Sequence, residues 1–164
     1  MATLTATRAK TGFPAGGVGP ATSLHVATGT YEVAANPSAS DVIEMCKLPA
    51  GAVVVMGWIM ADDLDTNATA TLDIDLGWAS NGTESANASG FGNLGVWNGT
   101  AVTDVKPETA NWFPLGGVLH TTGPQLFSAE TTIQFTVNAA AATGGTGTVT
   151  VVMLYFVDPN YVTT

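Results

Sequence analysis

The chain has 164 residues and a formal net charge of −9, and only 10% of its residues are charged although 46% are hydrophobic. This length suits one domain with a well-developed core, and the acidity argues against nucleic acid or an anionic membrane as a partner. The single cysteine, Cys46, excludes an intrachain disulfide.

The scarcity of charge bears on the surface, where small neutral residues such as Ala, Thr, Gly and Ser replace charged ones. Charge normally keeps soluble proteins apart, so this surface suits a protein that neighbours largely cover. A secreted or halotolerant domain is the alternative. No signal peptide is expected, because no apolar stretch follows Arg8 and Lys10. The longest apolar run, 52–61, is shorter than the roughly 20 residues that a membrane span needs.

Residues 1–22 are expected to form an extended arm, followed by a single domain over 23–164. Between Gly12 and Pro20 the sequence has two prolines and four glycines, a composition that neither a helix nor a central strand tolerates. A floppy tail is the common outcome at a chain terminus. We expect instead that a partner subunit holds the arm in an ordered conformation.

Short apolar or alternating stretches separated by turn residues predict strands along the rest of the chain. The first two, 24–28 and 30–34, lie on either side of Gly29. The other expected strands are 41–48, 52–61, 69–78, 95–97, 101–103, 118–120, 131–137 and 148–157, with loops over 80–93 and 139–147.

Two of these strands have contrasting patterns. The run 52–61 is apolar on both faces, which predicts a strand buried on both sides, either between two sheets or under a neighbouring subunit. By contrast, Leu72, Ile74 and Leu76 point one way while Asp73 and Asp75 point the other, which predicts a strand with one buried face.

No stretch of ten or more residues has the periodicity of an amphipathic helix, whereas about eight to ten short strands are expected. The sequence therefore predicts an all-β fold, a jelly-roll-like β-sandwich or barrel with an extended N-terminal arm. A jelly roll or a closed barrel would also limit pairing between exposed strand edges, which is a risk for long strands with few charges.

Few residues could support catalysis. Neither His25 nor His120 has an acid or a nucleophile at a meaningful spacing. Cys46 is expected to be a small buried hydrophobic residue, because the side chain of Lys47 points to the other face of the strand. The glycine-rich stretches lack the Gly-Lys-Ser/Thr ending of a phosphate loop. We predict that the chain is not an enzyme and has no catalytic residue, cofactor or metal.

One acidic cluster has the residue types of a calcium site. Asp62, Asp63 and Asp65 offer the oxygen ligands that calcium prefers. They follow a strand, however, and lack the glycine and the distal glutamate of an EF-hand loop. A solvated turn that discourages edge pairing is the favoured interpretation, with weak calcium binding left open.

The four tryptophans fall into two groups, according to whether they lie in apolar strands or near loops. Trp58 and Trp78 lie in apolar strands and are expected in the core, whereas Trp97 and the pair Trp112 and Phe113 lie near loops. Tryptophan is enriched at binding hot spots, so the second group is expected to anchor a subunit interface. A carbohydrate-binding platform is the alternative role for these aromatic residues.

The segment 41–55, in which a strand ending in Leu48-Pro49-Ala50-Gly51 leads into an apolar strand, resembles small virion proteins of tailed bacteriophages. The strand 73–77 and the closing Tyr155-Phe156-Val157-Asp158-Pro159 are similar to that type as well. The best match is a capsid decoration (cement) protein with a jelly-roll-like fold.

This resemblance implies a protein made in the host cytoplasm that sits on the capsid exterior and clamps neighbouring major capsid subunits. It also implies a homodimer or a homotrimer, with no catalytic residues and with neither nucleic acid nor membrane as a partner. Alternatives are a carbohydrate-binding β-sandwich and a tail or minor head protein. The residues expected at the interface are Arg8, Lys10, Phe13, Pro14, Trp97, Trp112 and Phe113.

Overall fold

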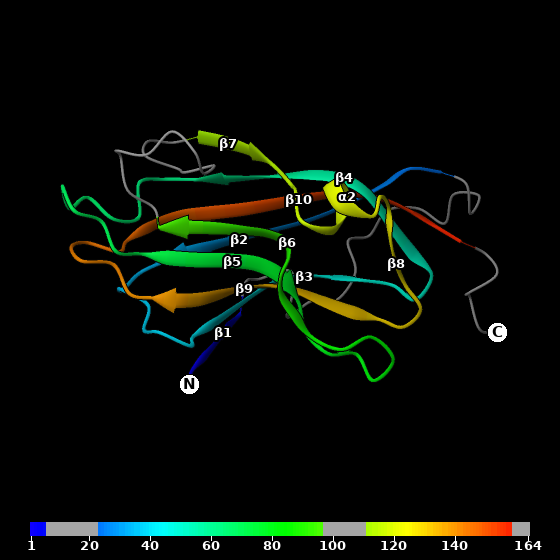
Figure 1. Cartoon of the computed structure of the whole chain (residues 1–164), viewed down its shortest axis with the longest axis horizontal. Coiled ribbons are helices and arrows are strands. Elements are labelled where there is room, and N and C mark those ends of the chain that lie inside the picture. The colour runs from blue at the N-terminus through cyan, green and yellow to red at the C-terminus, as the bar shows by residue number, and fades with distance from the viewer. Residues whose placement is uncertain (6–22, 97–110, 159–164) are drawn as a thin grey trace.

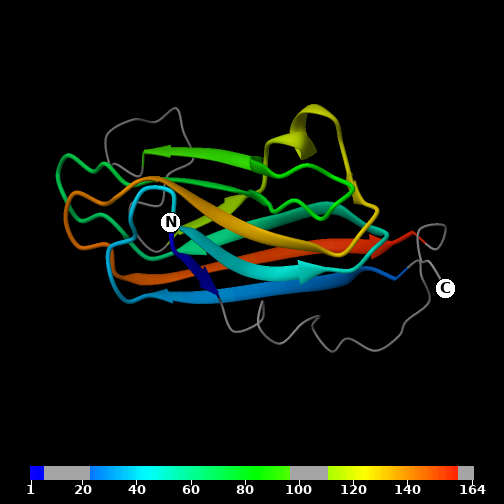
Figure 2. The same cartoon turned by 90° about the horizontal axis from the view of Figure 1, so that it is seen from below.

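The computed structural model describes residues 1–5, 23–96 and 111–158, which form two β-sheets stacked as two layers (Figures 1 and 2). The first sheet has the order β1 (Thr3–Thr5), β3 (Val42–Leu48), β9 (Thr131–Ala139), β5 (Asp73–Trp78) and β6 (Asn87–Val96). The second has the order β2 (His25–Val33), β10 (Gly147–Val157), β4 (Ala52–Ala61) and β7 (Asn111–Pro114), with β8 (Gln125–Phe127) also paired to β4. The predicted all-β sandwich is confirmed, while jelly-roll connectivity stays a prediction.

The core lies between the two sheets. Leu72, Ile74 and Leu76 are buried as the alternation predicts, and Ile133, Phe135 and Val137 of β9 are buried beside them. The prediction that the strand β5 has a single buried face is wrong, because Asp75 on the other side is buried as well. In the second sheet the inward residues of β10 are Val149, Val151, Met153 and Tyr155. Burial of these apolar side chains is the main force that holds the layers together.

An aromatic cluster fills one end of this core. The ring of Trp78 lies 5.1 Å from that of Phe91 and 5.2 Å from that of Phe127, both edge-on. Edge-to-face geometry at this separation is favourable for aromatic rings. The indole N–H of Trp78 donates to the Ser85 carbonyl at 3.1 Å, so its polar atom is satisfied. The prediction that Trp78 belongs to the core is confirmed.

A β-bulge explains why the 41–48 pattern alternates over only part of its length. The register between β3 and β9 shifts between Glu44 and Cys46, so that Met45 and Cys46 together oppose Ile133. A bulge of this kind turns two consecutive side chains to one face. Met45 and Cys46 are accordingly 0% and 1% exposed. Cys46 is the buried small residue that the sequence predicts.

The two layers approach each other most closely where β2 passes β3. A Cβ atom added to Gly29 would lie 2.0 Å from the Met45 carbonyl oxygen, a distance that backbone atoms do not permit. Glycine is therefore required at this position for close approach. Gly29 also lies inside one continuous strand, β2, and does not divide two strands as the sequence pattern indicates.

The N-terminal strand β1 adds a parallel edge to the first sheet, with Leu4 opposite Ile43. The Asp41 carboxylate holds this edge, because it accepts the backbone N–H of Ala2 at 3.0 Å and that of Ser38 at 2.9 Å. These N–H groups lower the pKa of Asp41. Residues 3–5 of the expected arm thus pair within their own chain, and the division at residue 22 stays a prediction.

Several sequence-based element assignments are wrong. Residues 118–120 do not form a strand but belong to the helix α2 (Val118–Thr121), which lies between β7 and β8 (Figure 1). The expected loop 80–93 contains the first part of β6, because its glycines allow close passage over Trp78: a Cβ on Gly90 would meet that ring at 2.0 Å. The short strands β7 and β8 were not anticipated, since each has only three or four residues.

Candidate protein-interaction surface

The outward-facing side of the second sheet carries an unusually apolar set of side chains. The strand β10 lies between β2 and β4, and directly paired residues on adjacent strands face the same side of a sheet (Figure 1). One row across the sheet is Val26, Leu154 and Met56, and the next is Thr28, Val152 and Trp58. We call this surface the apolar face; its apolar members are Val26, Val53, Val55, Met56, Trp58, Met60, Val152, Leu154 and Phe156.

A second bulge increases the apolar content of this face. The register between β4 and β10 shifts so that Val55 and Met56 both oppose Leu154. Both side chains therefore lie on the outer side, while Val54 and Ile59 point into the core with exposures of 0% and 1%. The alternative in which strand 52–61 lies between two sheets is wrong, because its second side is the apolar face; burial of that side under a neighbouring subunit stays a prediction.

Large apolar side chains on this face are open to solvent. Val26 is 45% exposed, Met56 52% and Met60 40%, and Leu24, directly before β2, is 59% exposed. The assignment of Trp58 to the core is also wrong, since it lies on the apolar face and is half-buried there. A contiguous exposed apolar surface of this kind marks an interaction site in soluble proteins.

The polar residues of this face lie toward one end. Thr30 and Thr150 are paired, and their hydroxyl oxygens lie 2.9 Å apart. Beyond them the Thr148 hydroxyl donates to the Glu32 carboxylate at 2.7 Å. Glu32 is the single charged residue that the described strands β2, β4 and β10 contribute to this side. The opposite end and the middle are neutral.

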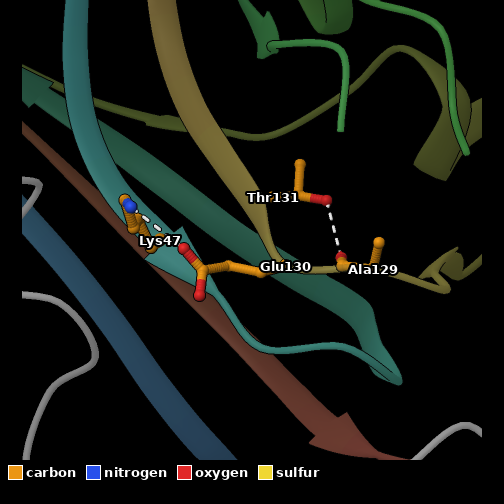
Figure 3. A network of polar contacts seen from close by, with 4 residues as sticks. All are labelled: Lys47, Ala129, Glu130 and Thr131. Carbon is orange, nitrogen blue, oxygen red and sulfur yellow. Dashed lines mark hydrogen bonds and ion pairs between the residues drawn. The ribbon is translucent and has the colours of Figure 1, made fainter. Parts of the chain in front are cut away.

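The outward side of the first sheet differs in composition. Its half-buried residues include Glu44 and Lys47 of β3, Asp73 of β5 and the polar side of β9, and we call it the polar face. At its rim, Lys47 Nζ lies 2.9 Å from the Glu130 carboxylate, next to the Thr131 hydroxyl that donates to the Ala129 carbonyl (Figure 3). Charged groups at this density are what a solvated face requires.

The interface residues predicted from sequence are only partly placed. Trp112 and Phe113 lie in β7, whose backbone pairs Trp112 with Met60 and Phe113 with Ile59. The other five, Arg8, Lys10, Phe13, Pro14 and Trp97, lie outside the described residues. Sequence reasoning missed Met56, Met60, Val152 and Leu154, although the uninterrupted apolar runs of β4 and β10 were the signal that could have identified them.

The acidic residues after β4 hold loops in place, because their carboxylates accept backbone hydrogen bonds. The carboxylate of Asp65 accepts five backbone N–H groups, from Asn67, Thr71, Leu72, Ala142 and Thr143, at 2.8 to 3.3 Å. Burial alone would raise the pKa of Asp65, but these donors together lower it. Its oxygens are therefore committed to the backbone, and Asp65 fastens the 66–72 loop to the 140–143 loop.

The two neighbouring acids are used in a similar way. Asp63 accepts the N–H of Asp65 at 3.1 Å, and Asp62 accepts the N–H of Thr148 at 2.8 Å. Within the described ranges, no three or more His, Cys, Asp or Glu side chains gather in a way that could hold a metal ion. The arrangement favours the interpretation of these acids as a turn.

A second carboxylate joins the loops at the other end of the sandwich. Glu84 accepts the backbone N–H of Ser128 at 2.9 Å, the Ser128 hydroxyl and the side-chain amide of Asn81. Burial opposes ionisation of Glu84, yet these donors lower its pKa. Like Asp65, Glu84 stabilises loops through the hydrogen bonds that its carboxylate accepts.

Cys46 and His25, which could in principle supply a nucleophile or a base, are both packed against the fold. Burial raises the pKa of the Cys46 thiol to about 12, which suppresses the reactive thiolate. The ring of His25 packs on Tyr155 with centroids 5.5 Å apart. An apolar depression between the sheets, lined by residues such as Val33, Ile43, Leu64 and Val149, has no room for a water molecule.

In the part of the chain that the structure covers, no helix has the length and apolarity needed to cross a membrane. No protein-family model matches the sequence, and no curated protein sequence matches it.

The fold does match chains of solved phage capsids. A chain of the cyanophage Pam1 capsid asymmetric unit is 26% identical, with 88% of this chain and 91% of that chain covered and a TM-score of 0.63. A chain of the capsid of Ralstonia phage GP4 is 18% identical over 96% of this chain and 99% of that one, with a TM-score of 0.69. A chain of the capsid of Helicobacter pylori bacteriophage KHP30 is 17% identical, covers 82% and 87%, and has a TM-score of 0.53.

Proposed function

We propose that this chain is a structural protein of a phage particle that decorates the capsid and stabilises it by clamping neighbouring major capsid subunits. The observation that carries the proposal is the fold match along nearly the whole chain to a component of the cyanophage Pam1 capsid at 26% identity. The matches to the GP4 and KHP30 capsids support the same fold.

The coverage values support an auxiliary role in the shell. The matched part is 91% of the Pam1 chain and 99% of the GP4 chain, so those capsid chains are themselves about as small as this one. A small β-sandwich that binds an assembled shell better than loose subunits shifts the assembly equilibrium by mass action. The binding of many copies then stabilises the shell against internal pressure.

The surface of the molecule suits this role. A chain with 10% charged residues and an apolar face on one sheet gains from being covered by protein neighbours. The cations Arg8 and Lys10 and the apolar residues Phe13 and Pro14 remain the predicted contacts of the N-terminal segment with a neighbouring subunit. In this proposal the acidic body faces outward, on the exterior of the virion.

The test is a binding experiment with shells of the cognate phage that lack this chain. The full-length chain is mixed with expanded shells, the shells are sedimented, and the bound copies are counted on a stained gel. We expect saturable binding of hundreds of copies per particle and an increase in the temperature at which the shells rupture. Unassembled major capsid protein serves as the control and should bind far more weakly.

The outcome distinguishes the alternatives. Saturation at only a few copies per particle would place the protein in the tail or in a minor head position. No binding to shells, together with binding on a glycan array that is lost in Trp97→Ala or Trp112→Ala, would replace the proposal with a carbohydrate-binding module.

A further inference from the structure

We infer that Asn81–Gly82 is a latent deamidation site, which the folded chain protects and whose conversion to aspartate or isoaspartate releases the loop between β5 and β6. The site lies in the 79–86 loop, which leads from Trp78 at the end of β5 to Asn87 at the start of β6. The inference rests on the sequence of this loop and on the hydrogen bonds of the Asn81 side chain. It does not depend on the proposed capsid role.

The pair Asn81–Gly82 has the residues from which a succinimide forms most readily. The backbone nitrogen of Gly82 attacks the side-chain Cγ of Asn81, a new N–Cγ bond forms, the Cγ–Nδ2 bond breaks, and Nδ2 leaves as ammonia. Water then opens the succinimide ring at either carbonyl, which gives aspartate or isoaspartate. Glycine has no Cβ to hinder the attack. Gly82 is also exposed, and apart from its chain neighbours no heavy atom lies within 4 Å of the place where a Cβ would stand.

The fold holds the Asn81 amide at both ends. Its Oδ1 accepts the backbone N–H of Thr83 at 2.9 Å and that of Glu84 at 2.7 Å. Its Nδ2 donates to the Glu84 carboxylate and to the Thr131 hydroxyl, the latter at 2.6 Å. Because donors surround the oxygen and acceptors surround the nitrogen, the amide has a single orientation in the loop.

These hydrogen bonds oppose the formation of the succinimide. Addition of the Gly82 nitrogen makes Cγ tetrahedral, which moves Oδ1 and Nδ2 of Asn81 out of the plane in which their partners hold them. The acceptor at Thr131 is itself fixed, since its hydroxyl donates to the Ala129 carbonyl at 2.9 Å (Figure 3). The reaction therefore proceeds mainly from molecules in which the loop has opened locally, and the folded chain should react more slowly than the unfolded one.

Conversion of Asn81 would disturb the contact that joins this loop to its neighbour. The Glu84 carboxylate accepts the Ser128 backbone N–H at 2.9 Å, so it links the 79–86 loop to the turn between β8 and β9. Burial opposes ionisation of Glu84, yet hydrogen bonds from Ser128 and Asn81 hold its pKa below the usual value. A carboxylate at position 81 would therefore repel that of Glu84 where the amide now donates to it. We expect Glu84 to move away and to release Ser128.

The experiment compares the deamidation of Asn81 in the folded full-length chain and in urea, at mildly alkaline pH. Chymotrypsin cleaves after Trp78, Phe91 and Trp97, so mass spectrometry reads Asn81 and the second such pair, Asn98–Gly99, in separate peptides. Asn98 lies outside the described residues, but both pairs precede a threonine and should react equally fast in urea. We expect Asn81 to react about tenfold more slowly in the folded chain than in urea. Equal rates, or a faster reaction in the folded chain, would overturn the inference.

Thr131→Val tests whether the hydrogen bonds of the amide provide the protection. It removes the hydroxyl that accepts from Asn81 and keeps a side chain of similar size, so the rate in the folded chain should rise about fivefold. Thr132→Val is the matched control, because Thr132 is the next residue of β9 and lies on the polar face opposite Lys47. It should leave the rate unchanged. With both rates measured well below the melting temperature of each variant, an equal effect of the two substitutions would contradict the role of Thr131.

Asn81→Asp tests the consequence, because it reproduces the aspartate product. We expect a melting temperature about 5 °C lower than that of the wild type and faster hydrogen exchange at the Ser128 N–H. Asn138→Asp is the control: Asn138 also donates to a carboxylate, that of Asp73 at 3.2 Å, but this contact is exposed. Screening by solvent should keep its change in melting temperature below about 2 °C. Exchange at Ser128 equal to that of the wild type would overturn the release of the loop.

Discussion

The two outward faces of this sandwich are both formed by β-strands, but they differ in the outward side chains that alternate with the buried core residues. On the polar face, Glu44, Lys47 and Gln134 alternate with buried residues such as Ile43 and Phe135. On the apolar face, Val152 and Leu154 alternate with the buried Val151 and Met153. A two-layer fold needs one apolar side on each sheet. The second apolar side of the second sheet is therefore not needed for folding.

The apolar face, and not the polar face, is the side on which a binding partner is to be sought. The polar face meets the ordinary requirement of a solvated sheet, with the inward side apolar and the outward side polar. The apolar face departs from that requirement over three adjacent strands, and the bulge at Val55 and Met56 extends the departure. Folding of the single chain does not explain these residues, so the apolar face is the surface to test for burial against another protein.

The largest expected effect separates the inner and outer sides of a single strand. Met153→Ala removes a fully buried side chain of β10 and should lower the free energy of unfolding by about 3 kcal/mol, because it leaves a cavity in the core. Leu154→Ala, one residue further on the apolar face, should cost about 1 kcal/mol or less. Urea unfolding of each variant measures both losses.

Equal losses in these two variants would contradict the assignment of Leu154 to an outward surface.

An intermediate effect is expected at the end of the sandwich where Asp65 joins the 66–72 loop to the 140–143 loop. Asp65→Asn replaces a carboxylate that accepts five N–H groups with an amide whose nitrogen cannot accept them, and should cost about 2 kcal/mol at pH 7. Asp62→Asn is the control, since Asp62 accepts a single backbone N–H and should cost less than about 1 kcal/mol.

The pH dependence of the same variant has a definite sign. The pKa of Asp65 is lower in the folded chain than its usual value of about 3.9. Its stabilising contribution is therefore complete above that value and is lost as the pH falls through the folded pKa. Wild-type stability should decline below about pH 4, and Asp65→Asn should decline less. Parallel curves for the two proteins would show that Asp65 is not the group responsible.

The smallest effect tests the polar face. Lys47 and Glu130 form an ion pair at 2.9 Å, but their side chains are 33% and 51% exposed. Exposed pairs contribute little in water, so a double-mutant cycle of Lys47→Ala and Glu130→Ala should give a coupling of about 0.5 kcal/mol that disappears in concentrated salt. A coupling above about 2 kcal/mol would mean that the polar face is less solvated than its composition indicates.

Sequence patterns anticipated much of the fold but little of the candidate surface. The alternation of Leu72, Ile74 and Leu76 was sufficient to place β5, since the alternation of side chains along a strand is a local property, but it did not show that Asp75 on the other side is buried too. Residues 118–120 were misassigned because a stretch of three residues carries no reliable period, and Gly117 with φ of 57° begins a helical turn there. The strand β7 was missed because its pairing with β4 is a long-range interaction.

By itself, the sequence determined that this is an all-β chain with one core, few charges and no recognisable constellation for catalysis, because composition and short-range periodicity are properties of the chain alone. Only the tertiary structure decided which of the two apolar sides of β4 faces the core. That choice depends on the bulge opposite Leu154 and on which sheet covers the strand. Met56 and Met60 are therefore surface residues, although nothing in their local sequence distinguishes them from Val54 and Ile59.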